Sequence, residues 1–161
     1  MNLNIKNIFQ LALTSHQEGK LDEAIIHYKK ALEIKPDLSA AHNNLGVIFQ
    51  SMNKLNEAEH SFRKALEINP NQVDAHNNLG SILFKLNKLE DAEKSYKKAI
   101  DLKSDNYVSY NNLGTVLFKL NKLEDAEKSY KKAIELKPDY NASTYDNLGK
   151  IYEIVGKLDE A

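Results

Sequence analysis

Asparagine is the residue whose position in this chain most clearly suits a chemical task. Four asparagines each precede a Leu-Gly pair, at intervals of 34, 34 and 35 positions: Asn44, Asn78, Asn112 and Asn147. Three more stand one position earlier: Asn43, Asn77 and Asn111. A carboxamide carries both a hydrogen-bond donor and an acceptor, which match the C=O and N–H groups of an extended peptide backbone. The pattern therefore suits peptide recognition that depends little on the sequence of the ligand.

Other site chemistries find little support. The chain has no cysteine, which excludes disulfides, zinc–thiolate sites and thiol nucleophiles. His42 and His76 are 34 positions apart and lack the i,i+4 spacing of a metal-binding helical pair. No Ser/His/Asp set or carboxylate pair stands out from the repeating pattern. We expect no metal, no cofactor and no catalytic activity.

The charge pattern bears on the class of partner. There are 22 basic and 23 acidic residues, giving a net charge of -1, and Arg63 is the only arginine. Such a balance gives no field that would steer the chain onto nucleic acid or an anionic membrane. No run of about 18 apolar residues and no signal-peptide pattern is present. We therefore expect a cytoplasmic protein that binds neither nucleic acid nor membrane.

A repeat of about 34 residues organises the chain into pairs of helices. Segments 84–100 and 118–134 are identical, which indicates an internal duplication. In the second repeat, apolar spacing predicts a first helix over about 39–52, closed by Asn53, and a second over about 56–68, followed by Pro70. The residues at the same closing position in the other repeats are Gly19, Asn87, Asn121 and Gly156. We expect i,i+4 ion pairs on the second helices, such as Glu90 with Lys94 and Glu93 with Lys97.

These residues resemble the tetratricopeptide repeat over nearly the whole chain. The unit that begins at Ser39 matches the family pattern at eight positions: His42, Leu45, Gly46, Phe49, Ala58, Phe62, Ala65 and Pro70. The resemblance implies an all-α fold, a right-handed superhelix of about four and a half helix-turn-helix repeats. We expect one array, with repeats over about 5–38, 39–72, 73–106 and 107–141 and a partial repeat over 142–161. Gly46, Gly80 and Gly114 are expected to pack against the alanines of their second helices.

The resemblance also places the functional surface. First helices of this family line a concave groove, and the residue before Leu-Gly points into it. The asparagines are similar in this respect to the asparagine ladder in the repeat region of O-GlcNAc transferases. The alternative is that they are simply solvated inner-face residues. Asn43, Asn77 and Asn111 stand where a carboxylate clamp would need its first lysine, so that mode is not expected. Phe84 and Phe118 either anchor apolar ligand side chains or pack between repeats.

The last repeat has only its first helix, with the second just beginning at Ala161. We expect a fragment of a longer array or a chain that a partner completes. Four apolar residues are predicted to be partly uncovered and to support self-association: Leu148, Ile151, Tyr152 and Ile154. Three functions follow: a scaffold that binds an extended peptide, the substrate-recruiting region of a larger enzyme such as a glycosyltransferase, or a scaffold that assembles through its C-terminal helix.

Overall fold

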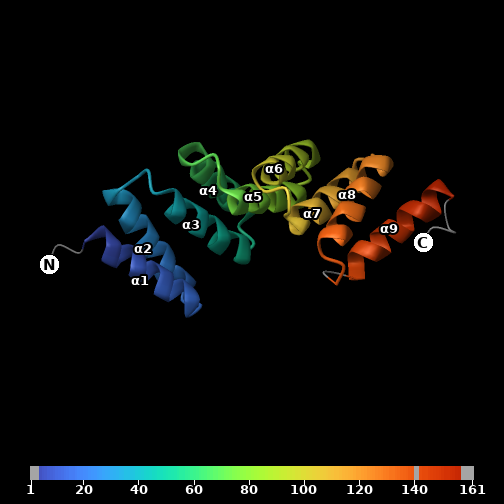
Figure 1. The fold of residues 1–161 in the computed structure, drawn as a ribbon. Helices are drawn as coiled ribbons and strands as arrows, with labels where there is room; N and C mark the ends of the chain where they lie inside the picture. Colours follow the sequence, from blue (N-terminus) through green and yellow to red (C-terminus); the bar gives the residue numbers. More distant parts are fainter. Residues whose placement is uncertain (1–3, 140–141, 157–161) are drawn as a thin grey trace. The chain divides into compact units, whose positions relative to one another are not determined.

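The computed structural model describes residues 4–139 and 142–156, and within them the chain is all-helical, with nine α-helices and no strand (Figure 1). This confirms the expected fold class and the two-helix repeat. The helices in chain order are α1 (Ile5–Gln17), α2 (Leu21–Ile34), α3 (Ser39–Ser51), α4 (Leu55–Ile68), α5 (Val73–Lys85), α6 (Leu89–Leu102), α7 (Tyr107–Lys119), α8 (Leu123–Leu136) and α9 (Ala142–Val155).

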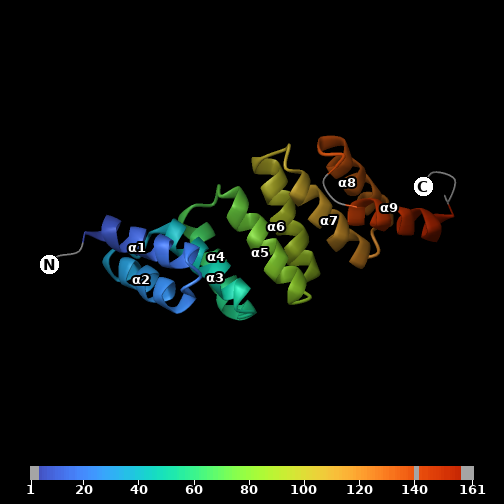
Figure 2. The same cartoon turned by 90° about the horizontal axis from the view of Figure 1, so that it is seen from below.

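The chain forms two compact units, Met1–Ile82 and Leu83–Ala161, and their boundary lies inside α5. In the first unit α1 packs on α2 and α3 on α4, and α2 also contacts α3. In the second unit α7 packs on α6 and α8, and α9 packs on α8 with a smaller contact to α7 (Figure 2). Within each unit these helices pack mainly on their neighbours in sequence, which is the packing of a helical repeat.

The turns inside the repeats close as the sequence predicts. Five residues adopt a positive φ between 56° and 74°: Gly19, Asn53, Asn87, Asn121 and Gly156. Each follows the first helix of its repeat, where glycine and asparagine tolerate the left-handed conformation best. The same five positions were predicted to end these helices, and the backbone confirms it.

The core of each repeat is built from alanines and one aromatic ring on the second helix. Ala58, Phe62 and Ala65 of α4 are fully buried, and Ala126, Tyr130 and Ala133 of α8 are at most 1% exposed. Small residues let the two helices approach closely, and the ring fills the space that remains.

The partner of the mid-helix glycines differs from the expectation. A Cβ at Gly46 would lie 2.6 Å from the Phe62 ring, and one at Gly114 would lie 2.8 Å from the Tyr130 ring. The glycines therefore make room for the aromatic ring of their own repeat, and the predicted contact with alanine is secondary. A ring needs more space than a methyl group, which is why glycine stands opposite it.

The charged faces are paired in part as predicted. Lys97 bonds Glu93 at 2.7 Å and Lys131 bonds Glu127 at 2.9 Å, each with the predicted i,i+4 spacing. Lys94 bonds Asp91 at 3.2 Å, with i,i+3 spacing. Glu93 accepts a second bond, at 2.7 Å, from Lys122, and this pair links α6 to the turn before α8.

Candidate functional site

The four asparagines that precede Leu-Gly are all partly exposed: Asn44, Asn78, Asn112 and Asn147. They lie on the first helices α3, α5, α7 and α9, each just before a leucine, which is buried after the first three and partly buried after Asn147. Part of the surface of each of these residues is therefore accessible to a ligand.

Asn44 has a structural partner that the sequence did not reveal. Its Nδ2 donates to the hydroxyl oxygen of Tyr28 over 2.9 Å. Tyr28 belongs to α2 of the preceding repeat and is fully buried. Burial raises the pKa of this phenol, and the bond from Asn44 opposes that rise. Asn44 thus satisfies a buried hydroxyl while its remaining polar atoms are left for solvent or a ligand.

Asn147 holds the corresponding position in the second unit, after Tyr130. The Tyr130 hydroxyl is fully buried and donates to Oγ1 of Thr115 over 3.1 Å. Burial raises the pKa of Tyr130, and the bonds with Thr115 and Asn147 oppose the rise. Because the phenol proton is used on Thr115, the phenol oxygen can act toward Asn147 only as an acceptor.

Asn78 lies in a different setting. The position that holds tyrosine at Tyr28 and Tyr130 holds Phe62 in the repeat before Asn78. Phe62 is fully buried but has no hydroxyl, so it offers the Asn78 carboxamide no such partner. The four asparagines are alike in sequence but not in their surroundings.

Of the asparagines one position earlier, Asn111 serves the packing of repeats. Asn111 is only 8% exposed, and its Oδ1 accepts a 2.8 Å bond from Thr144 of the next repeat. Its Nδ2 donates to Oδ1 of Asn112 over 3.3 Å. Asn111 is therefore occupied by the fold and is a poor ligand contact, contrary to its place in the predicted set. Asn43 and Asn77 are partly buried at the same helix position.

The Oδ1 atom of Asn43 is buried and has no hydrogen-bond partner. The residue equivalent to Thr144 in the next repeat is here Ala75, which is fully buried. Alanine supplies no hydroxyl, which explains the unsatisfied oxygen. A buried acceptor without a partner costs about 1–3 kcal/mol.

Phe84 and Phe118 are both partly buried near the ends of α5 and α7. The amine of Lys119 lies 4.7 Å from the centre of the Phe84 ring, a cation–π contact within the second unit. The partial exposure of the two rings leaves both predicted roles, anchoring and packing, compatible with their placement.

The C-terminal helix corrects part of the self-association prediction. Ile151 and Tyr152 are 0% and 3% exposed, not uncovered. Their equivalents in other repeats, such as Val116 and Leu117, are also buried. This face of the helix packs on the preceding repeat, because α9 contacts α8 and α7, and it needs no second helix of its own. Tyr152 also lies 5.5 Å below the Lys131 amine.

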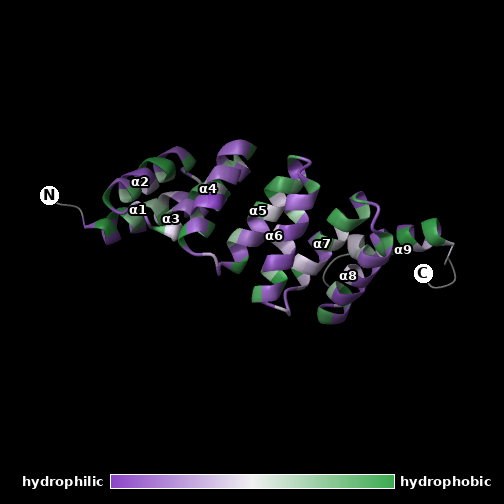
Figure 3. Ribbon diagram, turned by 90° about the horizontal axis from the view of Figure 1, so that it is seen from above, coloured by the Kyte–Doolittle hydropathy of each residue, from purple (hydrophilic) through white to green (hydrophobic). Residues whose placement is uncertain are grey.

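The opposite face of α9 is open. Ile154 is 60% exposed, Val155 is 40% exposed, and Leu148 is only partly buried, whereas Leu113 at the same position is 6% exposed. A Cβ at Gly149 would meet nothing within 4 Å, whereas Gly46 and Gly114 face aromatic rings. Figure 3 shows apolar residues at the C-terminal end of α9.

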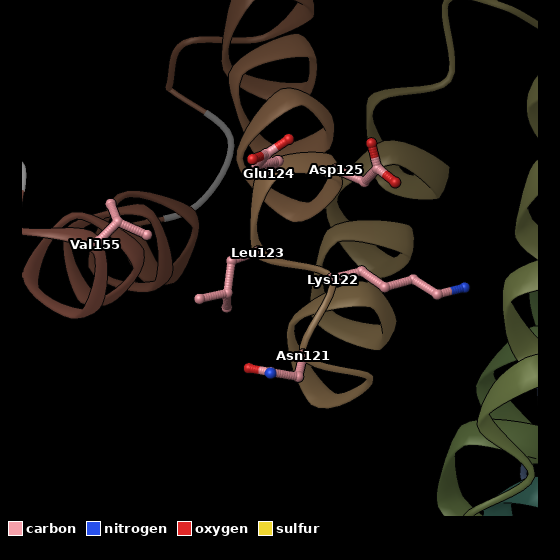
Figure 4. Close-up of a pocket in the computed structure, with 6 residues that line it drawn as sticks. All are labelled: Asn121, Lys122, Leu123, Glu124, Asp125 and Val155. Carbon is pink, nitrogen blue, oxygen red and sulfur yellow. The ribbon is translucent and has the colours of Figure 1, made fainter.

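A pocket of about 420 Å³ lies between the start of α8 and the end of α9. Leu123 and Val155 lie on its two sides, and the Lys122 side chain extends away from Val155 (Figure 4). The pocket adjoins the open end of α9 and holds no catalytic group set.

His42 and His76 contact the segments that precede their helices. Nε2 of His42 lies 3.1 Å from the carbonyl oxygen of Pro36, and that of His76 lies 2.9 Å from Pro70. Tyr145 uses its hydroxyl in the same way, on the carbonyl of Pro138 over 2.9 Å. Among the described residues no group of three potential ligands is placed to hold a metal ion. No helix in that part of the chain is long and apolar enough to cross a membrane.

Comparison with solved structures shows the same fold. The MamA protein aligns with a TM-score of 0.92 and 26% identity over 99% of this chain and 87% of that one. YrrB, described as a tetratricopeptide repeat protein with an unusual peptide-binding site, aligns with a TM-score of 0.87 and 23% identity over 96% and 79%. The first tetratricopeptide repeat domain of Spaghetti (RPAP3), bound to an HSP90 peptide, aligns with a TM-score of 0.71 and 27% identity over 73% and 93%. No curated protein matches the chain in sequence.

Family models agree with the repeat pattern. The tetratricopeptide repeat model matches residues 39–72, 73–106 and 107–140, and a second model of this repeat matches residues 14–53. These matches cover well over half of the sequence, and the three matches of the first model coincide with the helix pairs α3–α4, α5–α6 and α7–α8. The chain therefore belongs to the tetratricopeptide repeat family.

Proposed function

We propose that this protein is an interaction scaffold whose first helices bind extended polypeptide through their carboxamides, those of Asn44 and Asn78 in the first unit and those of Asn112 and Asn147 in the second. The observation that carries the proposal is that all four side chains stay partly exposed at the same position of a first helix. A carboxamide that reaches solvent can bond the N–H or C=O of a bound peptide. That a structural neighbour of 27% identity holds a peptide supports the same class of ligand.

The chemistry of these residues favours recognition of the peptide backbone. Carboxamides are neutral, and they pair with groups that every peptide carries, so affinity depends little on ligand charge. This resembles the asparagine ladder of O-GlcNAc transferases, and it differs from a carboxylate clamp, for which Asn43 and Asn77 replace the first lysine. Phe84 and Phe118, both partly exposed, are proposed to accept apolar side chains of the ligand.

Titration with peptides tests the proposal. An array of unstructured 15-residue peptides of varied sequence identifies binders, and fluorescence anisotropy then measures their affinity. Asn78→Ala is the sharpest variant, because Phe62 gives this asparagine no hydroxyl to satisfy. We expect a several-fold loss of affinity with unchanged helicity, since each net hydrogen bond contributes about 0.5–1.5 kcal/mol. Asn56→Ala removes an exposed asparagine of α4 and serves as the matched control. Equal affinities for both variants and the wild type would contradict peptide binding by this residue.

The open face of α9 supports a second role, self-association between two copies of the chain. The specific observation is Gly149, whose surroundings are empty where Gly46 and Gly114 each receive an aromatic ring. Ile154, Val155 and Leu148 add apolar surface beside it. Covering such a patch is favourable at about 25 cal/mol per Å² before the cost of association.

Sedimentation over a concentration series tests this second role. Ile154→Lys is expected to shift the protein toward the monomer mass of 18.3 kDa. Ile34→Lys alters an equally exposed isoleucine, at 57%, on α2 and should leave the mass unchanged. A wild-type protein that stays monomeric at high concentration would rule out self-association through α9.

A further inference from the structure

We infer that buried tyrosines, rather than the asparagines alone, set the peptide-binding strength of this surface by fixing the orientation of the carboxamides. Tyr28 and Tyr130 are the positioning residues, and Phe62 leaves Asn78 without one. The inference rests on the peptide-binding function proposed above, but its structural half is tested independently of any ligand.

The geometry of the first contact shows how the orientation is fixed. The hydroxyl of Tyr28 is buried and takes one N–H of Asn44 over 2.9 Å. A planar carboxamide with one N–H committed inward is held in one rotamer and keeps its oxygen for another partner. Asn44 therefore presents a fixed acceptor, which suits a peptide N–H.

Tyr130 is the counterpart of Tyr28 for Asn147. Tyr130 donates its only proton to Thr115 over 3.1 Å, so its oxygen can act toward Asn147 only as an acceptor. An Asn147 amide that donates to this oxygen is held with its nitrogen toward the phenol, and the lowering effect of Asn147 on the pKa of Tyr130 supports that arrangement.

The repeat that ends before Asn78 breaks the pattern. Phe62 stands 16 positions before Asn78, as Tyr28 stands 16 positions before Asn44. Its ring is fully buried against Gly46, and it has no hydroxyl to offer. A ligand that binds Asn78 must therefore order this side chain, whereas Asn44 is ordered beforehand. Ordering a side chain on binding lowers affinity by about two- to tenfold.

Phe62→Tyr supplies the hydroxyl that the position before Asn78 lacks. The fold accepts tyrosine here, because Tyr28, Tyr96 and Tyr130 occupy the equivalent positions and are at most 3% exposed. The added hydroxyl is placed to receive an N–H of Asn78, as Tyr28 receives one from Asn44. Tyr28→Phe is the matched variant in the opposite direction.

Side-chain ¹⁵N relaxation of the asparagine NH₂ groups tests the positioning without a ligand. We expect Asn44 and Asn147 to be ordered and Asn78 to be more mobile in the wild type. Phe62→Tyr should order the Asn78 group, and Tyr28→Phe should release that of Asn44. An Asn78 group that is already as ordered as Asn44, or that is unchanged by Phe62→Tyr, would overturn the inference.

Peptide affinity tests the functional half with the tightest binder from the 15-residue array. We expect Phe62→Tyr to bind about two- to tenfold more tightly and Tyr28→Phe to bind more weakly by a similar factor. A variant that is merely less stable does not bind peptide more tightly. A gain in affinity in Phe62→Tyr would therefore indicate positioning of Asn78 rather than a purely structural effect. If the wild type binds peptide and both variants bind it equally, the inference fails while the proposed function stands. If the wild type binds no peptide, the proposed function itself fails, and the functional half of the inference fails with it.

Discussion

At the scale of single residues, the asparagines before the Leu-Gly pairs make different contacts. Asn44 satisfies a buried phenol, Asn111 bonds Thr144 between repeats, and Asn43 leaves an oxygen without a partner. The difference lies in the residue that each one meets in a neighbouring repeat. Stability and binding can therefore be separated by the choice of asparagine that is mutated.

The first prediction compares Asn44→Ala with Asn78→Ala. Removing the Asn44 amide leaves the Tyr28 hydroxyl buried without its donor, which should lower the free energy of unfolding by about 1–3 kcal/mol. Asn78 has Phe62 at the position where Asn44 has Tyr28, so no buried hydroxyl depends on it. Asn78→Ala should therefore lower the free energy of unfolding by less than about 0.5 kcal/mol. Urea unfolding followed by circular dichroism measures both. Equal losses in the two variants would show that the phenol bond does not stabilise the fold.

A second prediction concerns the unsatisfied oxygen of Asn43. Ala75 holds the position that Thr144 holds in the last repeat, where the threonine hydroxyl donates to Asn111. In Ala75→Ser the new hydroxyl should donate in the same way to Asn43 Oδ1. The site has room, since Ser109 is fully buried at the same position of the next repeat. The free energy of unfolding should rise by about 1 kcal/mol. Ala75→Val, which adds bulk without a hydroxyl, is the control and should not stabilise the protein.

At the scale of helices, packing is decided by what faces each glycine and each buried charge. Gly46 and Gly149 are both mid-helix glycines in the same sequence motif, yet one lies under a ring and the other faces open space. Similarly, Glu93 on α6 joins Lys97 of its own helix and Lys122 before α8. Substitution at these residues therefore measures how much contacts between helices contribute to the stability of the protein.

Alanine substitution of the two glycines should have opposite effects. At Gly46 the new Cβ would lie 2.6 Å from the Phe62 ring, and the resulting overpacking should destabilise the protein by about 1–3 kcal/mol. At Gly149 the space is open, so the higher helix propensity of alanine should stabilise α9 by up to about 1 kcal/mol. Thermal unfolding of the two variants measures the signs. A loss of stability in Gly149→Ala would mean that this face of α9 is covered in solution.

Acid should weaken the link between α6 and the turn before α8. Burial raises the pKa of Glu93, but bonds from Lys122 and Lys97 outweigh it and hold the pKa below the ordinary 4.5. A depressed folded-state pKa gives stability that is present above the unfolded value and is lost as pH falls through the folded value. Below about pH 4.5 the wild type should therefore lose stability faster than Glu93→Gln.

Unfolding by urea at several pH values provides the measurement. Glu93→Gln should be the less stable protein at neutral pH, and the gap should narrow in acid. The exposed Glu124→Gln controls for general charge effects. Parallel pH curves for the wild type and Glu93→Gln would refute a role for this carboxylate in the acid response.

At the scale of the whole chain, the near balance of charges limits how partners are recognised. The net charge is -1, and the four asparagines proposed to hold a peptide are neutral. In the proposed binding mode, hydrogen bonds to a peptide backbone supply the affinity, and long-range attraction contributes little. This distinguishes the proposed mode from a charged clamp for acidic peptide ends.

The corresponding prediction is a weak dependence of peptide affinity on salt. Raising sodium chloride from about 0.1 M to about 1 M shortens the Debye length from about 10 Å to about 3 Å. We expect the affinity of the array-selected peptide to change less than about threefold over this range. A fall of one or more orders of magnitude would indicate that lysines rather than carboxamides hold the ligand.

The sequence by itself determined the repeat, the helix pairs and the turn residues. Those features follow from local causes, namely apolar spacing, the left-handed turns at Asn53 and its equivalents, and the prolines that stop second helices. The positions of Asn44 and Asn147 on first helices could be read in the same way. The sequence also shows an aromatic residue 16 or 17 positions before each asparagine: Tyr28 before Asn44 and Tyr130 before Asn147. Before Asn78 this residue is Phe62, which has no hydroxyl.

Only the tertiary structure decided which polar atoms are used and which faces are covered. Asn111 and Asn112 are adjacent in sequence, but a neighbouring Thr144 makes one buried and leaves the other partly exposed. Ile151 and Tyr152 were predicted to be open, but they are buried because α9 presents that face to α8 and α7. The physical reason is that a helical period fixes which residues share a face, whereas the packing of neighbouring helices fixes what that face meets.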